Sequence, residues 1–533
     1  MNEIEAQRHV VIPQWLPFGK AASQREAREF IGQPKVIDFA AAVKDFQDEL
    51  VDFKSDPAPF FGSELMGIAF ANGSGAEAKE LAEYVITEPI TGPVAIRQAM
   101  GILGRATPTA IEDERAKLRR LRGSLKQYPR DAIASIEQAR IYTIFGLREK
   151  ARKAVMVALH IAPSNRFVVR AAIRFFIHFE EWDSALRYAN TGFKLSNDPL
   201  IFAPLLSVAT YLNKLPFSIK PIAAKALASE NAFLYSEALE AFGTLEIESG
   251  ADKRSRPFFK QAWLDPAKAV ISHSQWVLRE RLPGLRKEQN IDFTKSSEAL
   301  SWLHLWILDF EGAIRCTWDW ALEEPYSRAP YILGSSIASM LEKHDVAIDF
   351  AKRGRIANPK DEVLINNQAF AQLRSGDVTG GEATFSSIRH LLTEAEQIAP
   401  LATYGLLLMA KGRISDGQKQ YTEAIRRAAE GGNTKLEMRA SLNFLISLLD
   451  ICKAIEPETL SLAATALDSI QDPISLGTSM EIVKRLKKLS IADEAKLLPA
   501  IQSFIHVTEK KRLEFIESAF FKGVKSSSPG SLQ

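Results

Sequence analysis

Histidine and cysteine are the side chains of this protein that most often bind metals or act as nucleophiles. The two cysteines, Cys316 and Cys452, lie too far apart in sequence to suggest a CxxC metal or redox site, and they indicate buried free thiols in a reducing compartment. None of the histidines stands in an HExxH pattern or beside a cysteine pair. The eight histidines are His9, His160, His178, His273, His304, His344, His390 and His506. We therefore expect no bound metal.

Other motifs with known chemistry are equally sparse. The segment Asn72-Gly73-Ser74-Gly75 has two glycines but no following Lys-Ser/Thr, so it indicates a hairpin turn rather than a phosphate-binding loop. No G-x-S-x-G nucleophile elbow occurs, and the acidic residues are scattered over expected helix surfaces. The sequence favours a non-catalytic protein without a cofactor. An active site built from distant residues, or an activity carried by residues 1–55, remains an alternative.

A basic segment between Arg115 and Arg130 could touch phosphates. It contains Lys117, Arg119, Arg120, Arg122 and Lys126, and it follows Glu112-Asp113-Glu114. Acids before bases suit both the helix dipole and ion pairs four residues apart, so a solvated helix face is the simpler interpretation. The whole protein has 67 Lys and Arg against 65 Asp and Glu, a net charge of +2. That balance argues against a protein-wide nucleic-acid surface.

The 533 residues far exceed one ordinary compact domain, whereas the 46% hydrophobic and 25% charged content is that of a globular protein. The first twenty residues lack the basic segment and long apolar stretch of a secretory signal. The longest apolar stretch, around Ala399 to Ala410, is about half of a membrane span. We expect a cytoplasmic protein that does not bind a membrane.

Small residues recur at fixed spacing and define an internal repeat. Ala139 is followed at +12 by Ala151, at +19 by Ala158 and at +24 by Pro163. The same offsets recur from two other positions: Ser335, Ala347, Gly354 and Pro359, and then Gly405, Gly417 and Ala424. A period of thirty-odd residues indicates stacked copies of one small unit, and such stacks usually bind other proteins.

The spacing predicts a pair of helices in each unit. A small residue in the first helix allows the second helix to cross it closely, at about 8–10 Å between axes. The small residue at +19 does the same where the second helix meets the next unit. Asn or Asp with Pro closes units, because proline cannot continue a helix. Gly376 and Gly412 fall at turns between paired helices, where a positive φ is easy only for glycine.

These residues resemble the tetratricopeptide repeat. The matching strings are Ala139…Tyr142…Ala151…Ala158…Pro163, Leu239…Phe242-Gly243…Phe259…Ala262, and Gly405…Gly412…Tyr421…Ala424. The resemblance covers residues 132–269 and 328–431, with 34-residue steps from 132 to 166 and from 328 to 362. The tryptophan usual early in the first helix is absent. The weaker units could belong to a neighbouring class of helical-hairpin repeat.

The resemblance implies a concave groove lined by the first helix of each unit. In that register Arg140, Arg170, Arg174 and His178 face the groove beside apolar residues. Arginine binds carboxylates through two parallel hydrogen bonds, so an acidic peptide or the C-terminus of a partner protein would suit this surface. The alternative is that these arginines are solvated or paired with Glu137 and other local acids.

In the later block the same register gives an apolar groove fit for an amphipathic helix. Asn366, Phe370 and Arg374 come from one unit and could contact the partner, Asn366 through the peptide backbone. Alternatively, the C-terminal helices fold back into this groove. The lysine and asparagine set of the chaperone-tail carboxylate clamp is not reproduced, which disfavours a chaperone-tail receptor.

A group of tryptophans lies between the two blocks. Trp302 and Trp306 are four residues apart and share a helix face, and Trp318 and Trp320 follow. Core packing is the simpler interpretation, and a partner-binding hot spot is the other.

We therefore expect an all-α, right-handed α-solenoid of tetratricopeptide-like hairpins. Its expected role is a scaffold or adaptor that docks one or more proteins, as a peptide or amphipathic helix, in the groove. An accessory subunit of a bacterial effector or defence complex with a nucleic-acid or nucleotide link is the second hypothesis, although nucleic-acid binding is disfavoured. The sequence leaves the oligomeric state open. The expected segments are 1–55 without repeats, 56–127 degenerate hairpins, 128–269 repeat block, 270–327 irregular, 328–431 repeat block, 432–521 helical cap and 522–533 disordered tail.

Overall fold

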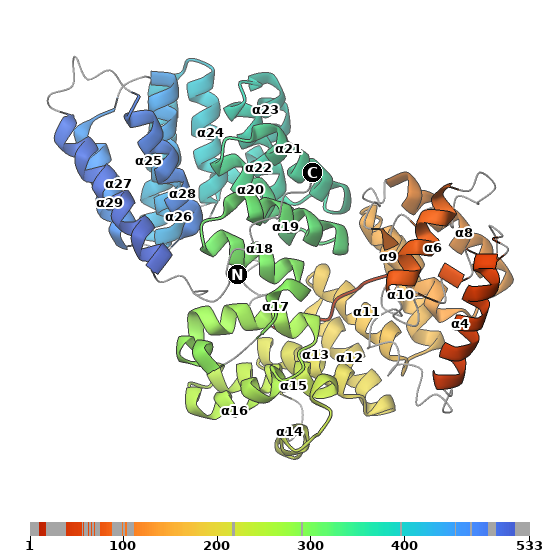
Figure 1. Cartoon of the computed structure of the whole chain (residues 1–533). Coiled ribbons are helices and arrows are strands. Elements are labelled where there is room, and N and C mark those ends of the chain that lie inside the picture. The colour runs from red at the N-terminus through yellow and green to blue at the C-terminus, as the bar shows by residue number, and fades with distance from the viewer. Residues whose placement is uncertain are drawn as a thin grey trace. The chain divides into compact units, whose positions relative to one another are not determined.

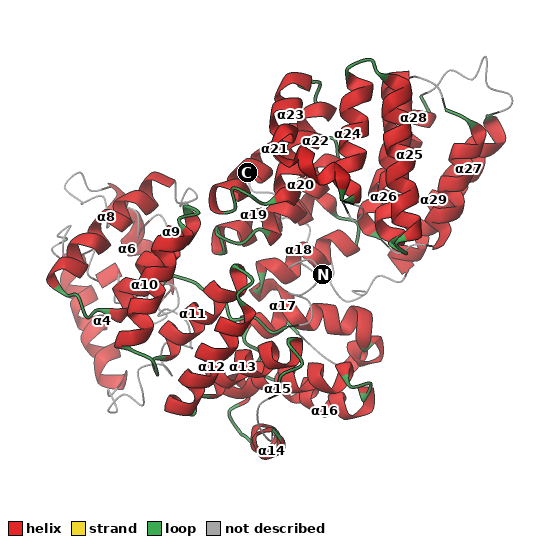
Figure 2. Cartoon of the chain, turned by 180° about the vertical axis from the view of Figure 1, so that it is seen from behind, coloured by secondary structure: helices red, strands yellow, loops and turns green. Residues whose placement is uncertain are grey.

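A computed structural model describes residues 10–17, 39–55, 57, 62, 65, 66, 69, 75–87, 99, 102–103, 111–215, 219–288, 291–394, 397–452, 455–469, 472–488 and 497–517. These residues form helices joined by loops, and none of them lies in a strand (Figures 1 and 2). The expected all-α class is confirmed. The turn expected at residues 72–74 and the tail expected at 522–533 lie outside the described residues.

The protein forms two compact units. The short unit comprises Trp15–Ile141 and Ala151–Val168, and the long unit comprises Met1–Gln14, Tyr142–Lys150 and Val169–Gln533. In the short unit, Leu50 and Phe53 of the first helix pack on Leu81 and Val85 of the second. Its described helices are α4 (Phe39–Ser55), α6 (Gly75–Thr87), α8 (Ile111–Gln127), most of α9 (Ala132–Ile144) and most of α10 (Arg148–Ile161).

The long unit continues the succession of helices along the sequence. Its first part contains α11 (Arg166–His178), α12 (Trp182–Ser196), α13 (Pro199–Tyr211), α14 (Lys220–Leu227), α15 (Ala232–Glu248), α16 (Asp252–Ala262) and α17 (Lys268–Trp276). Its second part contains α18 (Ser297–Trp306), α19 (Phe310–Glu323), α20 (Ala329–Met340), α21 (His344–Ala357), α22 (Glu362–Arg374), α23 (Val378–Phe385), α24 (Ile398–Ala410) and α25 (Ile414–Glu430). It ends with α26 (Thr434–Ser447), α27 (Pro457–Ser469), α28 (Pro473–Leu486) and α29 (Leu498–Glu517).

Paired helices touch at the small residues, as the spacing predicts. A methyl group added to Gly405 of α24 would lie 2.9 Å from the carbonyl oxygen of Gly417 in α25. At the +19 position, a methyl group on Gly354 of α21 would lie 2.9 Å from Leu364 Cδ1 in the next unit. These distances leave no room for a larger side chain. The backbones of paired helices therefore meet at Gly405, and Gly354 packs directly against a side chain of the next unit.

A left-handed backbone position marks the turns between paired helices. Gly376 (φ +88°) and Gly412 (φ +80°) adopt it as predicted. The same turn position is filled elsewhere by residues other than glycine: Glu180, Asn213, Leu308 and Glu342, with φ between 52° and 62°. From Gly146 to Glu180, and from Leu308 through Glu342 to Gly376, the steps are 34 residues. The repeat therefore continues through turns that lack a glycine.

The Trp-rich stretch 270–327 contains a complete hairpin, α18–α19, in register with the later block. Its turn residue Leu308 precedes the equivalent Glu342 by 34 residues. Before it, α17 ends in a π turn, η1 (Val277–Arg281), followed by two 3₁₀ turns, η2 (Pro283–Glu288) and η3 (Phe293–Lys295). The irregularity expected for this stretch thus lies ahead of Ser297.

Pro204 lies inside α13, which nevertheless continues to Tyr211. Pro204 has no N–H to give to the carbonyl of Leu200, four residues earlier. Arg170 Nη1 instead donates to that oxygen at 2.6 Å. A side chain from the preceding hairpin thus satisfies the carbonyl that the proline leaves open.

Candidate partner-binding site

Arg140, the first arginine expected to line the groove, is buried on α9 of the short unit. It is 2% exposed and pairs with Glu114 of α8 at 3.2 Å. Glu137, the acid that the sequence suggested as its partner, accepts instead from Lys117 at 2.7 Å. The basic helix α8 therefore pairs with α9 through both of these contacts.

Arg170 and Arg174 lie one turn apart on α11 and are also buried. Arg170 binds both carboxylate oxygens of Glu237, at 2.6 and 2.9 Å. Arg174, 2% exposed, lies 3.6 Å from Glu324 and stacks over the ring of Tyr326 at 5.2 Å. In the structure, Arg170 and Arg174 therefore pair with acids of the same protein, as the alternative interpretation of the sequence allowed. A direct contact with a partner stays a prediction, and it would first require loss of these ion pairs.

His178, one turn beyond Arg174, is buried against the rings of Phe179 and Tyr326. Burial lowers its pKa well below the usual range, and the positive charges of Arg174, Arg328 and Arg148 lower the pKa further. The imidazole is therefore neutral at physiological pH. Among the described residues, neither of its ring nitrogens has a hydrogen-bond partner.

The three residues expected in the later groove, Asn366, Phe370 and Arg374, all lie on α22. Asn366 is 7% exposed, and its Oδ1 has no hydrogen-bond partner among the described residues. Phe370 is partly buried against the core that includes Leu373 and Leu406. Arg374 bridges two acids, Glu342 at 3.1 Å and Asp450 at 2.8 Å.

Helix α28 returns from the C-terminal part of the protein and packs against α18 and α20 as well as α26. Gly477 of α28 lies so close to Met340 of α20 that an added methyl group would collide with the methionine sulfur, and Phe310 lies 3.1 Å from the same point. These contacts place α28 on α18, α20 and α26, beside the groove expected on α22 and α24. Occupation of that groove, by a partner helix or by C-terminal helices, stays a prediction.

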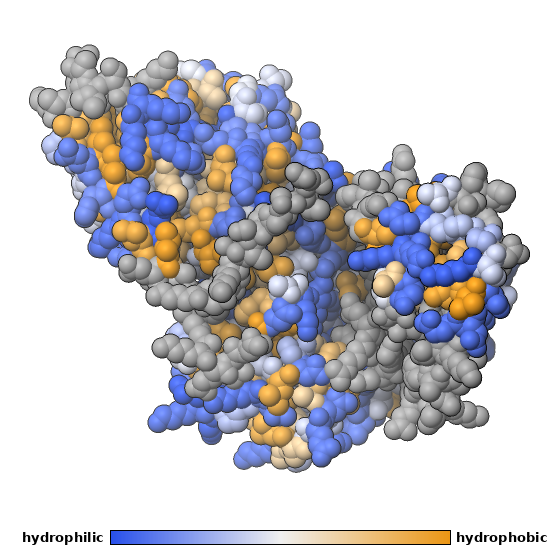
Figure 3. Space-filling model, viewed as in Figure 1, coloured by the Kyte–Doolittle hydropathy of each residue, from blue (hydrophilic) through white to orange (hydrophobic). Residues whose placement is uncertain are grey.

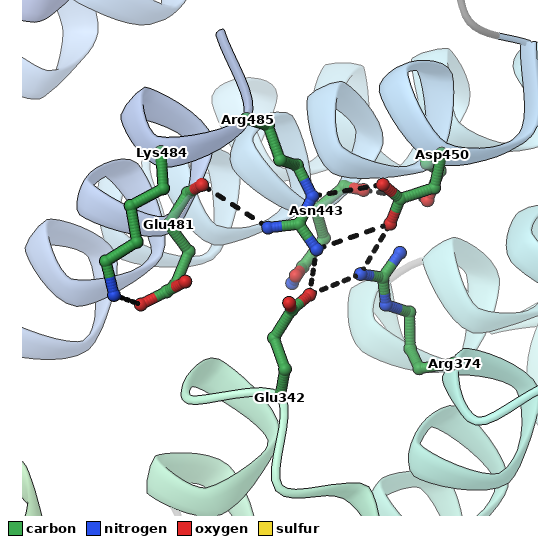
Figure 4. Close-up of polar contacts among 8 residues, drawn as sticks. Glu342, Arg374, Asn443, Asp450, Glu481, Lys484 and Arg485 are labelled. Carbon is green, nitrogen blue, oxygen red and sulfur yellow. Dashed lines mark hydrogen bonds and ion pairs between the residues drawn. The ribbon is translucent and has the colours of Figure 1, made fainter. Parts of the chain in front are cut away.

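A four-residue ion network, defined by Glu342, Arg374, Asp450 and Arg485, holds this return in place (Figure 4). Arg485 of α28 pairs with Glu342 and, at 3.0 Å, with Asp450. Each arginine contacts both acids. The network therefore joins the turn after α20, the end of α22, the π turn η5 (Leu448–Cys452) and the end of α28.

A pocket of about 240 Å³ opens in the long unit, and we call it the α18 pocket. Its walls come from α17, α18 and α20, from the starts of α26 and α28, and from the extended residues 10–14. Three of the four tryptophans of the sequence cluster line it, namely Trp302, Trp306 and Trp320, together with Trp276. Trp318 instead stacks on Phe350 at 3.7 Å. The cluster therefore serves both core and pocket.

One face of α18 forms the centre of this wall. Glu298, Trp302 and Trp306 follow one another at intervals of four residues, so they share a helix face, and all three line the pocket. Burial raises the pKa of the Glu298 carboxyl to about 7, and the negative charge of Glu324 adds to the rise. A carboxyl in this state exchanges its proton readily near neutral pH.

The other acids of the pocket region have cationic partners. Glu324 faces Arg174, and Asp472 binds Arg439 through two contacts of 2.9 Å. Glu280 pairs with Arg279 and accepts from Trp276 Nε1 at 2.7 Å. Glu298 alone among these four has no cation within ion-pair distance in the described part of the protein, although the Ser272 hydroxyl partly offsets the rise of its pKa.

An extended segment of the protein itself borders the α18 pocket. Val10, Ile12 and Gln14 line the pocket, while Val11 and Pro13 between them are buried, the alternation of an extended backbone. Within the described residues, no hydrogen bond connects residues 10–14 to the helices. Burial of apolar side chains, rather than a backbone ladder, therefore holds this segment in place.

The sequence patterns missed Glu298, His273 and the extended segment. Glu298 stands four residues before Trp302, so its place on the same helix face was readable from spacing alone. His273 donates to or accepts from Glu240 at 2.8 Å, across 33 residues of sequence, and no local pattern indicates that contact. Val10–Gln14 carries no motif, and only the tertiary structure places it against the pocket.

Other chemistry is sparse in the described residues. They contain no group of three or more His, Cys, Asp or Glu arranged to hold a metal ion. Burial and the negative charge of Asp319 raise the pKa of the Cys316 thiol to about 11, which keeps it protonated at neutral pH. In the same described part of the protein, no helix has the length and apolar character needed to cross a bilayer.

A further apolar surface lies on the C-terminal helices. Leu462 of α27 and Leu513 and Ile516 of α29 are exposed, and Figure 3 shows hydrophobic patches over this part of the molecule. No described residue indicates what would cover them.

No family model matches the sequence, and no curated protein matches it. Among solved structures, yeast Tom70 shares 13% identity, covers 83% of this protein and 99% of its own length, and gives a TM-score of 0.29. The human IFIT1 dimer with PPP-AAAA shares 10% identity over 96% of this protein and 99% of that one, with a TM-score of 0.25. The structure of Naa15/Naa10 bound to HypK-THB shares 15% identity over 90% of this protein and 95% of the matched one, with a TM-score of 0.24. Likeness at this level carries no conclusion about function.

Proposed function

We propose that this protein is a non-catalytic interaction scaffold that holds an extended segment of a partner protein at the α18 pocket. The observation that carries the proposal is the extended segment 10–14, which is buried through Val11 and Pro13 on one face and lines this pocket with the other. A surface that holds one extended apolar segment has the shape to hold another of similar chemistry.

The chemistry of the pocket supports binding rather than catalysis. Its tryptophans supply large apolar area and indole N–H groups, a composition enriched where proteins bind partners. The buried arginines on α11 contribute by fixing the surrounding helices: Arg170 joins α11 to α15, and Arg174 joins α11 to Glu324 beyond α19. They act as structural supports of the site in this proposal.

The test uses Ser336 of α20, which lines the pocket and is partly exposed, and Ser339, which lies three residues on and does not line it. A photo-crosslinking residue at Ser336 should capture a partner in the native host, and mass spectrometry should map the captured peptide. The purified partner should then bind the wild-type protein and Ser339→Arg, and it should lose binding to Ser336→Arg. Equal binding to both variants would contradict the proposal.

A further inference from the structure

We propose that the α18 pocket receives the side chain of a lysine or arginine carried by the extended partner segment. This inference rests on the proposed function, because it names what the partner presents to the same surface. The argument comes from three groups in the pocket: an unpaired carboxylate, an imidazole nitrogen without a partner, and aromatic walls.

The carboxylate is that of Glu298. Glu280, Glu324 and Asp472 already face cationic side chains, whereas Glu298 has none within ion-pair distance among the described residues. An ionised carboxylate removed from water without a cation is costly, and a cation that enters the pocket offsets that cost. Glu298 is therefore the pocket acid at which an added cation would find no competing ion pair among the described residues.

The imidazole nitrogen is Nε2 of His273, a pocket-lining residue that is 5% exposed. Its Nδ1 lies 2.8 Å from Glu240, whose other oxygen accepts from Trp263 Nε1 at 2.9 Å. With the ring proton on Nδ1, donated to Glu240, Nε2 is a hydrogen-bond acceptor. Among the described residues, Nε2 has no partner. A lysine or arginine N–H supplies the donor that it lacks.

The walls suit a cation as well. Arg279 of the π turn already stacks over the ring of Trp306 at 4.3 Å, so a guanidinium on an indole face is a contact that this wall makes. Trp302 lies between Glu298 and Trp306 on the same face of α18 and lines the pocket with them. Indole faces attract the aliphatic stem and the charged head of a long basic side chain together.

The segment 10–14 supplies the geometry for a probe. Ile12 is its central pocket-lining residue, so a basic residue at that place in a peptide of the same sequence would enter the pocket. We would titrate acetyl-VVRPQ-amide and its neutral isostere, in which citrulline replaces arginine, into the full-length protein and follow tryptophan fluorescence. A second full-length variant, with residues 10–14 replaced by Gly-Ser repeats, removes competition from the tethered segment.

The arginine peptide should bind saturably and at least about tenfold more tightly than the citrulline peptide, because a charge-assisted hydrogen bond is lost with the isostere. Glu298→Gln should reduce the affinity for the arginine peptide to the level of the citrulline peptide. Glu311→Gln, an exposed acid on α19 outside the pocket, should leave both affinities unchanged.

The outcomes separate the two proposals. Equal binding of the two peptides, or unchanged binding by Glu298→Gln, would overturn basic side-chain recognition and leave the extended-segment groove intact. Failure of both peptides to bind either the wild-type protein or the Gly-Ser variant would overturn this inference and count against the groove itself.

Discussion

At the scale of single residues, the basic lining expected on α11 is an internal set of ion pairs. Arg170 and Glu237 are 9% and 1% exposed, so neither side chain is available to solvent. A reversal of Arg140, Arg170 and Arg174 to acids would place like charges against Glu114, Glu237 and Glu324. Such a variant would therefore report on stability rather than on partner binding.

The Arg170–Glu237 pair gives the first prediction. Arg170→Met should reduce the free energy of unfolding by about 3–5 kcal/mol, because it leaves a buried carboxylate without a cation and removes the donor to Leu200. Adding Glu237→Gln in the same protein should restore part of this loss, since the uncompensated charge disappears. Urea unfolding followed by circular dichroism measures both variants, and no difference between the single and double variants would contradict the charge argument.

Glu298 gives a prediction about pH. Its pKa of about 7 in the folded protein exceeds the ordinary value of 4.5, so the folded state holds this proton more tightly than the unfolded state. Stability from this group is therefore lost as pH rises from 4.5 to about 7, and the loss is complete above that range. The charged groups around it are Glu324, Glu323 and Arg174, with the Ser272 hydroxyl also in contact.

Glu298→Gln resembles the protonated acid at every pH. It should raise the melting temperature relative to wild type at pH 8 and change it little at pH 5. Thermal unfolding at the two pH values checks this, and Glu311→Gln, an exposed acid on α19, serves as the control. A constant difference between wild type and Glu298→Gln at both pH values would contradict the assignment of the proton to Glu298.

At the scale of elements, the hairpin is defined by where its helices touch and where its backbone turns. The small-residue sites predict the first correctly, because only Gly, Ala or Ser allows two backbones to approach this closely. The turn position was predictable only where it holds glycine. Glu180 and Glu342 adopt the same left-handed geometry at a steric cost, and each also pairs with an arginine.

The close approach of α24 and α25 gives the third prediction. Gly417→Leu should destabilise the protein by about 1–3 kcal/mol, because the added atoms meet Met409 and the carbonyl of Gly405. Stacked hairpins contact mainly their neighbours, so amide exchange should rise in α22–α26 and stay unchanged in α13–α16. Lys419→Leu, which adds the same side chain at an exposed position of α25, should leave exchange unchanged in both regions.

At the scale of the whole molecule, most helices of the long unit contact their neighbours in sequence, but α28 packs on α18 and α20, which lie far before it in the sequence. The core around Phe310, Met340 and Ile474 and the four-residue ion network support this packing together. The α18 pocket includes Asp472, Pro473 and Ile474 at the start of α28, so the same packing completes its wall. Stability of α28 and the shape of the site are therefore linked.

The ion network gives the fourth prediction. Arg485→Met should reduce the free energy of unfolding by about 1–2 kcal/mol, because a largely buried guanidinium loses its ion pairs with two exposed carboxylates, and amide exchange in α28 should rise. Arg413→Met removes an exposed pair with Asp416 and should cost about 0–1 kcal/mol without a change in α28. Exchange in α28 that is equal in the two variants would show that the network does not hold this helix.

The sequence alone determined the helical class, the paired helices at 132–269 and 328–431, and the small-residue contacts. Local spacing encodes these features, because helix pairing and close approach depend on residues a few turns apart. Only the tertiary structure decided that the arginines of α11 pair with Glu237 and Glu324, that α28 returns to α20, and that Val10–Gln14 borders the α18 pocket. Each of these contacts joins residues far apart in sequence, and its energy depends on how deeply it is buried. A local sequence pattern indicates neither the distant contact residue nor the burial.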